Sequence, residues 1–233
     1  MTEPTSSPSH SAGPTPADVP TPTRILKDAD QDRAFPLYVV WEITMKCDQP
    51  CQHCGSRSGR ARPDELTTAE AFEVCDALAR LGSREVTLIG GEAYLRHDGE
   101  DLIRRLAGQG IRVTMQTGGR AFTLERARRF KDAGLRGVGV SIDGPAAAHD
   151  ELRGNVGSHA AGMRALENGA AVGLVVTANT QINRLNRHDL PATADTLRRM
   201  GAQAWQVQLT GPPGRAPDHP QWIAEPLMSW PCF

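Results

Sequence analysis

Residues 45–54 read Met-Lys-Cys-Asp-Gln-Pro-Cys-Gln-His-Cys and contain three of the five cysteines of the chain. Cys47, Cys51 and Cys54 follow the spacing C-x3-C-x2-C. Thiolates this close in sequence can converge on one soft metal centre. Three thiolates do not complete such a centre, so we expect the rest of the chain to supply a fourth ligand or to hold another molecule there.

Composition limits the partners and the cellular location that we expect for the protein. The chain has 233 residues, a formal net charge of −1 and a pI of about 6.7, so nothing indicates a nucleic-acid or membrane partner. No apolar run approaches the roughly 18 residues of a membrane span. The first residues lack the basic and apolar regions of a signal peptide. Clustered cysteines are not typical of a secreted disulfide framework, and we therefore expect a cytoplasmic protein.

Short apolar runs alternate with amphipathic segments on both sides of the cysteine loop. The first helix begins at a capping box, Thr67 to Glu70, and ends at Gly82. Five helices are predicted in all, and we expect a loop over residues 145–157. The six predicted strands cover residues 37–43, 85–89, 112–116, 137–142, 174–178 and 204–209. This alternation implies parallel strands joined by right-handed crossovers.

Unusual motifs follow all six predicted strands. In an open sheet, functional loops gather at one switch point, whereas in a barrel they line the whole carboxyl rim. The pattern therefore favours the α/β class, as a partial (β/α)6 TIM-like barrel over residues 37–215. We expect residues 1–36 to be a disordered Pro/Ser/Thr-rich leader and linker. Residues 216–233 are expected to be a short C-terminal tail.

Spacing alone leaves three interpretations of the cysteines open. A zinc site needs a fourth ligand, and His53 lies directly beside Cys54, where it would strain to share the tetrahedron. A ferredoxin-like cluster needs a fourth cysteine, but Cys75 falls on the apolar face of the first helix. The third interpretation is a [4Fe–4S] cluster with one iron open to a substrate or cofactor.

The cysteine motif after the first strand of a βα barrel resembles that of the radical S-adenosylmethionine (SAM) superfamily. The resemblance implies that the three cysteines hold a [4Fe–4S] cluster whose fourth iron chelates the amine and carboxylate of SAM. In this family the reduced cluster breaks the sulfonium bond and releases a 5′-deoxyadenosyl radical, which removes a hydrogen atom from a substrate. His53 occupies the usually aromatic position that lies near the adenine.

A second motif, Gly90-Gly91-Glu92 after the second strand, matches the family's glycine–glycine–glutamate sequence, which binds the methionine amine. Glycine lets the backbone approach closely. Carbonyl or carboxylate oxygens accept hydrogen bonds from an ammonium group.

Residues 141–154 look like the S-[IVL]-D-G…H-D-x-x-R-G stretch of the peptide-modifying branch. By this resemblance, Ser141 and Arg153 lie near the SAM ribose and carboxylate. Without it, Asp143 would be a turn residue and Arg153 a surface charge. The candidate cofactor-binding residues are His53, Gly90, Gly91, Glu92, Thr117, Ser141, Asp143, Arg153, Asn179 and Gln208. No catalytic residue of the chain itself is predicted.

The chain also departs from that branch, whose members usually continue into a cysteine-rich SPASM or twitch extension with auxiliary clusters. Here only Cys232 follows the barrel. The hypotheses are a truncated or frame-shifted member and a minimal member that relies on a separate peptide-recognition protein.

The resemblance implies a radical SAM enzyme that acts on a ribosomally made peptide or protein and takes electrons from a donor such as flavodoxin or ferredoxin. Three alternatives stay open. They are the same chemistry on a small-molecule substrate, a truncated non-catalytic protein that binds a cluster or partner, and a zinc-stabilised binding protein.

Overall fold

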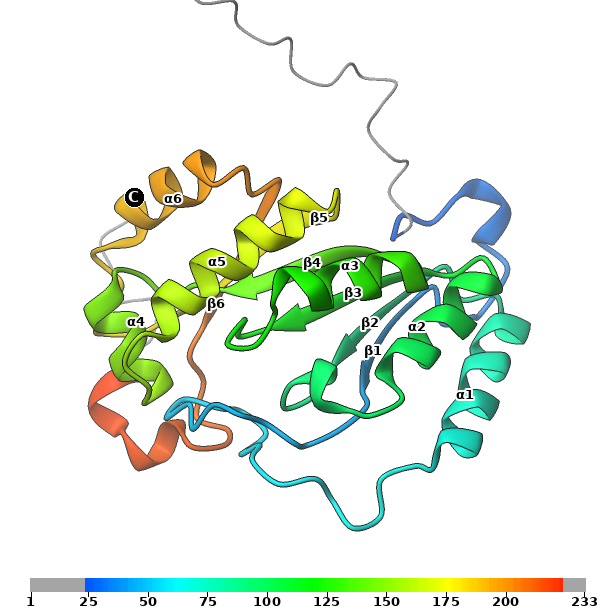
Figure 1. Ribbon diagram of the computed structural model, residues 1–233, viewed down its shortest axis with the longest axis horizontal. Helices are drawn as coiled ribbons and strands as arrows, with labels where there is room; N and C mark the ends of the chain where they lie inside the picture. The colour runs from blue at the N-terminus through cyan, green and yellow to red at the C-terminus, as the bar shows by residue number, and fades with distance from the viewer. Residues whose placement is uncertain (1–23, 224–233) are drawn as a thin grey trace, which may run out of the picture.

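A computed structural model describes residues 24–223 of the chain, and its six parallel strands form one curled sheet in sequence order (Figure 1). The strands are β1 (Tyr38–Glu42), β2 (Glu85–Ile89), β3 (Arg112–Thr117), β4 (Leu135–Ser141), β5 (Val175–Ile182) and β6 (Ala204–Leu209). The helices are α1 (Thr68–Leu81), α2 (Gly99–Gly108), α3 (Leu124–Ala133), α4 (Ala146–Arg153), α5 (Ser158–Ala171) and α6 (Leu190–Arg199). The prediction of a partial TIM-like barrel is confirmed. No helix among the described residues is both long enough and apolar enough to cross a membrane.

The core lies between the outer face of the sheet and the helices. Val86, Leu88, Val113 and Met115 alternate with polar residues along β2 and β3, and all four are buried. Side chains alternate between the two faces of a strand, so the polar residues point to the concave inner face. The barrel therefore has an apolar outside under its helices and a polar inside.

The first predicted helix forms as its sequence indicates. The Thr67 hydroxyl accepts a hydrogen bond from the Glu70 backbone, and the Glu70 carboxylate accepts one from the Thr67 backbone. Gly82 ends α1 in the left-handed conformation. Cys75 is fully buried in the apolar core, which confirms that it packs there.

Two predicted boundaries are wrong. The expected loop over residues 145–157 contains α4, whose sequence Ala-Ala-Ala-His-Asp-Glu-Leu-Arg is rich in helix formers and ends at Gly154 with a φ of 60°. Strand β5 continues to Ile182, four residues beyond its predicted end, because its pairing with β6 extends to Leu209. Asn179 therefore lies within a strand and not in the loop after it.

The described parts of the two terminal segments are ordered. Within the expected leader and linker, residues 24–36 contain the short helix η2 (Asp28–Asp30) and contact the sheet, where Arg24 pairs with Glu85 at 2.6 Å. The predicted bounds of the leader and linker, residues 1–36, stay a prediction. In the expected C-terminal tail, residues 216–223 form η4 (Ala216–Asp218) and η5 (Pro220–Trp222), and the Trp222 side chain is buried. Residues 1–23 and 224–233, with Cys232, lie outside the described residues.

The end of β2 lies directly against the start of the cysteine loop. The Gly91 amide donates to the Thr44 carbonyl, and the Glu92 amide donates to the Lys46 carbonyl, each at 2.8 Å. A Cβ on Gly90 would lie 2.2 Å from the Thr44 oxygen, and one on Gly91 would lie 2.3 Å from the Lys46 oxygen. Both glycines are therefore required for close backbone packing.

We expect Gly91→Ala to lower the free energy of unfolding of the metal-free protein by about 1–3 kcal/mol or more, because the new methyl overlaps backbone that has no room to move. Urea denaturation followed by circular dichroism measures this change. Gly108→Ala is the control, since a Cβ at Gly108 meets no atom within 4 Å. This control should be neutral or stabilising by about 0.5 kcal/mol. Equal stability of Gly91→Ala and wild type would contradict the packing role.

Candidate cofactor site at the cysteine loop

A cavity of about 180 Å³ lies at the carboxyl end of the sheet, and we call it the cysteine cavity. Three cysteines from one loop face residues from the ends of β2, β3 and β4. Its lining includes Cys47, Gln49, Cys51, His53, Cys54, Gly90, Gly91, Glu92, Thr117, Gly118, Ser141, Arg153 and Gln181. The fold therefore brings together the three cysteines and seven of the ten candidate cofactor-binding residues.

The other three candidates lie elsewhere. Asp143 is fully buried beside the cavity and contacts three of its lining residues, His53, Arg153 and Gln181. Asn179 lines a second cavity of about 410 Å³ on the polar inner face of the sheet, which we call the inner-face cavity. Gln208 is exposed on β6 and lines neither cavity.

Two segments distant in sequence hold the cysteine loop. Thr44 and Met45, just before the first cysteine, are held by Glu65. The Glu65 carboxylate accepts hydrogen bonds from the Met45 amide at 2.6 Å and from the Thr44 hydroxyl at 2.9 Å. At the cysteines, the Arg215 guanidinium donates to the Cys51 carbonyl at 2.9 Å, and the Arg215 amide donates to the Cys54 carbonyl at 2.9 Å. The loop is thus fixed by backbone contacts, which leaves its thiols available to a ligand.

The three thiols differ in their environments. Burial raises the pKa of Cys47 to about 12 and also raises the pKa of Cys51. Burial opposes ionisation of Cys54 as well, but hydrogen bonds from Ser58 and Ser56 outweigh it and hold this pKa below its usual value. Metal ligation requires thiolates, so the environment of Cys54 favours the form of this side chain that a metal would bind.

The thiol geometry bears on the kind of metal centre. Among the described residues, Cys47, Asp48 and Glu92 form the group of three ligand atoms that lie within 4.8 Å of one another, and the three cysteines do not form such a group. Sulfur ligands of one tetrahedral zinc ion lie about 3.8 Å apart. At least one pair of the three thiols is therefore farther apart than the ligands of one tetrahedral zinc ion.

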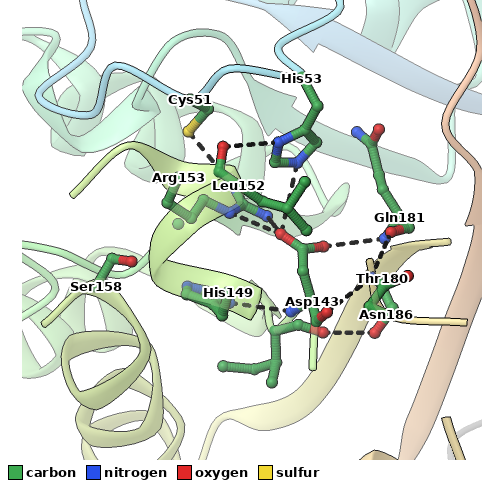
Figure 2. Close-up of polar contacts among 12 residues, drawn as sticks. Cys51, His53, Asp143, His149, Leu152, Arg153, Ser158, Thr180, Gln181 and Asn186 are labelled. Atoms are coloured by element: carbon green, nitrogen blue, oxygen red, sulfur yellow. Dashed lines mark hydrogen bonds and ion pairs between the residues drawn. The ribbon is translucent and has the colours of Figure 1, made fainter. Parts of the chain in front are cut away.

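Asp143 is the centre of the polar network beside the cavity (Figure 2). Its Oδ2 accepts a hydrogen bond from Arg153 Nε at 2.8 Å, and its Oδ1 accepts one from the Gln181 amide at 3.0 Å. Its backbone carbonyl accepts from Asn186 Nδ2, and its backbone amide donates to His149 Nδ1. Asp143 is therefore bonded through side chain and backbone, which is more than a turn residue requires.

The charges in this network fit its hydrogen bonds. Burial alone would raise the pKa of Asp143, but Arg153 and His53 outweigh it and hold this pKa well below its usual range. Burial and the nearby Arg153 lower the pKa of His149 to about 3. His149 is thus neutral and can accept the Asp143 amide at Nδ1.

The same network reaches the cysteine loop through two side chains. Arg153 Nη1 lies 3.7 Å from Cys51 Sγ, within hydrogen-bonding range of sulfur. His53 Nδ1 lies 3.0 Å from the Leu152 carbonyl, and its Nε2 lies 3.5 Å from Asp143 Oδ2. The His53 ring is thus held by both nitrogens at the cavity wall, while its predicted place near an adenine stays a prediction.

Glu92 is buried and already bonded on both carboxylate oxygens. Oε2 accepts from the Thr117 hydroxyl, and Oε1 accepts from the Gly118 amide at 2.7 Å. Burial raises the pKa of Glu92 to about 7. Each oxygen keeps a lone pair that can accept from a cation, and a bound cation would favour the ionised carboxylate.

Sequence reasoning missed several residues of this site, and two of them concern the cysteine loop itself. Arg215 holds the cysteine loop, and its position after β6 was the only feature of the sequence that could have indicated a place in the site. Gln49 lies between two cysteines and is 4% exposed as a residue, and neither its Nε2 nor its Oε1 has a hydrogen-bond partner among the described residues. Nothing in the motif distinguishes this glutamine from a solvent-exposed loop residue.

We expect Arg153→Met to lower the free energy of unfolding of the metal-free protein by about 3–5 kcal/mol, because it leaves the Asp143 carboxylate buried without its main counter-ion. Chemical denaturation at neutral pH measures the loss. Arg129→Met is the control, since Arg129 pairs with Glu100 at the surface and such pairs contribute about 0–1 kcal/mol. Similar losses in both variants would refute the special role of the buried pair.

Comparison with known proteins agrees with this geometry. The sequence profile of the Radical SAM superfamily matches residues 41–197. An AdoMet-dependent heme synthase of Nitratidesulfovibrio vulgaris is 33% identical over 180 residues, which are 76% of this chain and 49% of the relative. Mycofactocin maturase MftC of Mycobacterium tuberculosis is 33% identical over 197 residues, which are 84% of this chain and 50% of the relative.

Among solved structures, Streptococcus suis SuiB bound to S-adenosylmethionine superposes with a TM-score of 0.67 at 16% identity, over 76% of this chain and 41% of SuiB. This likeness concerns the fold. The chain spans about half the length of the curated relatives it matches. From the family profile, which covers more than half of the chain, and from these relatives it follows that the chain belongs to the radical SAM superfamily.

Proposed function

We propose that this protein is a radical SAM enzyme that holds a [4Fe–4S] cluster with Cys47, Cys51 and Cys54 and binds SAM beside it. The main supporting observation is that the three thiols line one cavity together with Glu92 and Arg153. When bound, the cluster and SAM supply a 5′-deoxyadenosyl radical that removes a hydrogen atom from a substrate. We also propose a cytoplasmic location, since the four cysteines among the described residues are free thiols.

The residues of the chain have separate tasks in this proposal. Glu92 accepts hydrogen bonds from the amino group of SAM with its remaining lone pairs. Ser141 offers a hydroxyl group at the end of β4, near the expected ribose, while the Thr117 hydroxyl at the end of β3 donates to Glu92 and orients its carboxylate. Arg153 donates toward Cys51 Sγ and favours the thiolate form of this ligand. A cluster held by these cysteines would take its electron from a donor such as flavodoxin or ferredoxin.

We further propose a peptide as the substrate, and charge is the first argument. The arginines that line the two cavities each face a buried carboxylate. Arg24 and Arg112 lie 2.6 and 3.8 Å from Glu85, and Arg153 lies 2.8 Å from Asp143. Arg24 and Arg112 share Glu85, and the buried Glu92 adds a third carboxylate, so three arginines stand against three carboxylates. The two cavities therefore offer no excess of positive charge to a substrate with several carboxylates.

Side-chain chemistry is the second argument. The inner-face cavity carries the amides of Gln116, Asn179 and Gln206 and the hydroxyls of Thr114 and Thr177. Amide side chains donate and accept hydrogen bonds at neutral charge, which complements a peptide backbone. The maturase relative and the SuiB structure with its precursor peptide SuiA agree with a peptide substrate.

A small metabolite is the second candidate. The relatives also include AdoMet-dependent heme synthases and an Fe-coproporphyrin III synthase, at 32–35% identity. Anaerobic incubation with SAM and either the precursor peptide or the metabolite encoded nearby, followed by mass spectrometry, decides between the two candidates.

The chemistry itself is tested by anaerobic reconstitution. We expect about four iron and four sulfide per chain, followed by release of 5′-deoxyadenosine with dithionite and SAM. Cys47→Ala, Cys51→Ala and Cys54→Ala should each reduce this release to background, because each removes a cluster ligand, whereas Cys75→Ala should retain it. One zinc without sulfide would disprove the proposal. A complete cluster without product would support a non-catalytic protein.

Replacement of Glu92 separates SAM binding from cluster binding. We expect Glu92→Ala to weaken SAM affinity about tenfold or more while iron content stays unchanged, because it removes a charged hydrogen-bond acceptor worth about 1.5–3 kcal/mol. Equilibrium dialysis measures affinity, and iron analysis measures the cluster. Loss of iron in this variant would instead assign Glu92 a structural role.

A further inference from the structure

The side chain of Gln49 is a buried polar group that the fold does not satisfy. Gln49 is 4% exposed as a residue, and both its Nε2 and its Oε1 are buried without a hydrogen-bond partner among the described residues. A buried amide without partners destabilises a protein, and most such groups in folded proteins are bonded. The position of Gln49 therefore requires an explanation other than the stability of the metal-free fold.

The backbone of Gln49 is fixed at the cysteine cavity. Its amide lies 3.4 Å from Cys47 Sγ, and its carbonyl also lies 3.4 Å from this sulfur. Pro50 follows directly and restricts the backbone of Gln49 to extended conformations. The side chain thus starts from a constrained position beside a predicted cluster ligand and lines the cavity.

Gly118 provides the space into which this side chain extends. A Cβ on Gly118 would lie 2.3 Å from Gln49 Nε2 and 2.9 Å from Glu92 Oε1. The amide and the carboxylate therefore flank the same glycine, and a larger residue there would displace both. Gln49 and Glu92 form a two-residue wall of the cavity. The Gln49 amide is neutral and can donate and accept hydrogen bonds, whereas the Glu92 carboxylate accepts them.

This wall matches one particular chemical group. Glu92 can accept from an ammonium but cannot donate to a carboxylate, whereas the Gln49 amide offers two N–H donors and one oxygen acceptor. An α-amino acid carries an ammonium and a carboxylate on one carbon. Such a group can accept a hydrogen bond from Gln49 Nε2 and donate one to Gln49 Oε1. Arg153, which also lines this cavity, is already paired with Asp143.

We propose that Gln49 binds the α-amino-acid end of SAM, with its Nε2 donating to the carboxylate and its Oε1 accepting from the ammonium. This inference rests on the proposed function, since SAM is the molecule proposed to occupy the cavity. It adds a residue of the cysteine loop itself to the cofactor contacts, so the segment that carries the cluster ligands also recognises the cofactor.

The test uses Gln49→Met, which keeps the length of the side chain and removes its polar atoms. We expect the melting midpoint of the metal-free variant to rise by a few degrees, because an unpaired amide is replaced by an apolar group. We expect the reconstituted variant, with unchanged iron content, to bind SAM about tenfold more weakly. Affinity for 5′-methylthioadenosine, which lacks the amino-acid end, should not change.

Gln52→Met is the matched control. Gln52 lies on the same loop and is half-buried, but it does not line the cysteine cavity. This control should leave SAM affinity within twofold of wild type. Gln49→Glu keeps the acceptor and loses the donors, so it should also bind SAM more weakly than wild type.

The outcomes separate this inference from the proposed function. If reconstituted wild type binds no SAM, both are overturned. If wild type binds SAM and Gln49→Met binds it equally well, the inference alone is overturned, and a buried water is the better partner for the amide. Weaker binding of SAM and of 5′-methylthioadenosine to the same degree would also overturn it, because the loss would then not concern the amino-acid end.

Discussion

The buried ion pair between Asp143 and Arg153 joins the parts of the chain that form the cysteine cavity. Asp143 follows β4, Arg153 ends α4, and the guanidinium of Arg153 also reaches Cys51 Sγ (Figure 2). Burying either charge alone is costly, and the pair is tolerable because further hydrogen bonds satisfy both partners. The pair therefore orients α4 against the cysteine loop, and the loop against the sheet.

Contacts to the backbone also fix the position of the cysteine loop. The glycines at the end of β2 let the strand approach the first residues of the cysteine loop, and Arg215 after β6 donates to its carbonyls. The loop is thus held by the first strand–helix unit and by the last described segment. A site that depends on both ends of a half-barrel forms only when the whole sheet has folded, which couples the geometry of the thiols to the fold.

The two faces of the sheet have different roles, because the outer face is apolar and the inner face is polar. The outer face supplies stability through burial against the helices. The inner face buries few apolar side chains and carries amides, hydroxyls and paired charges instead. The cysteine cavity lies at the carboxyl end of this face, where parallel strands place their functional loops. Gln116 lines both cavities and so connects the site of the cofactors with the space proposed for a substrate.

The sequence by itself determined the alternation of strands and helices, the caps of α1 and the cluster of three cysteines, because these follow from local spacing along the chain. Only the tertiary structure decided which residues reach the cavity. Side chains on one face of a strand recur every second residue, about 6.6 Å apart, so the longer β5 places Gln181 at the cysteine cavity and Asn179 below it. Likewise, the unpaired amide of Gln49 and the loop contacts of Arg215 depend on segments far apart in sequence, and no local pattern encodes them.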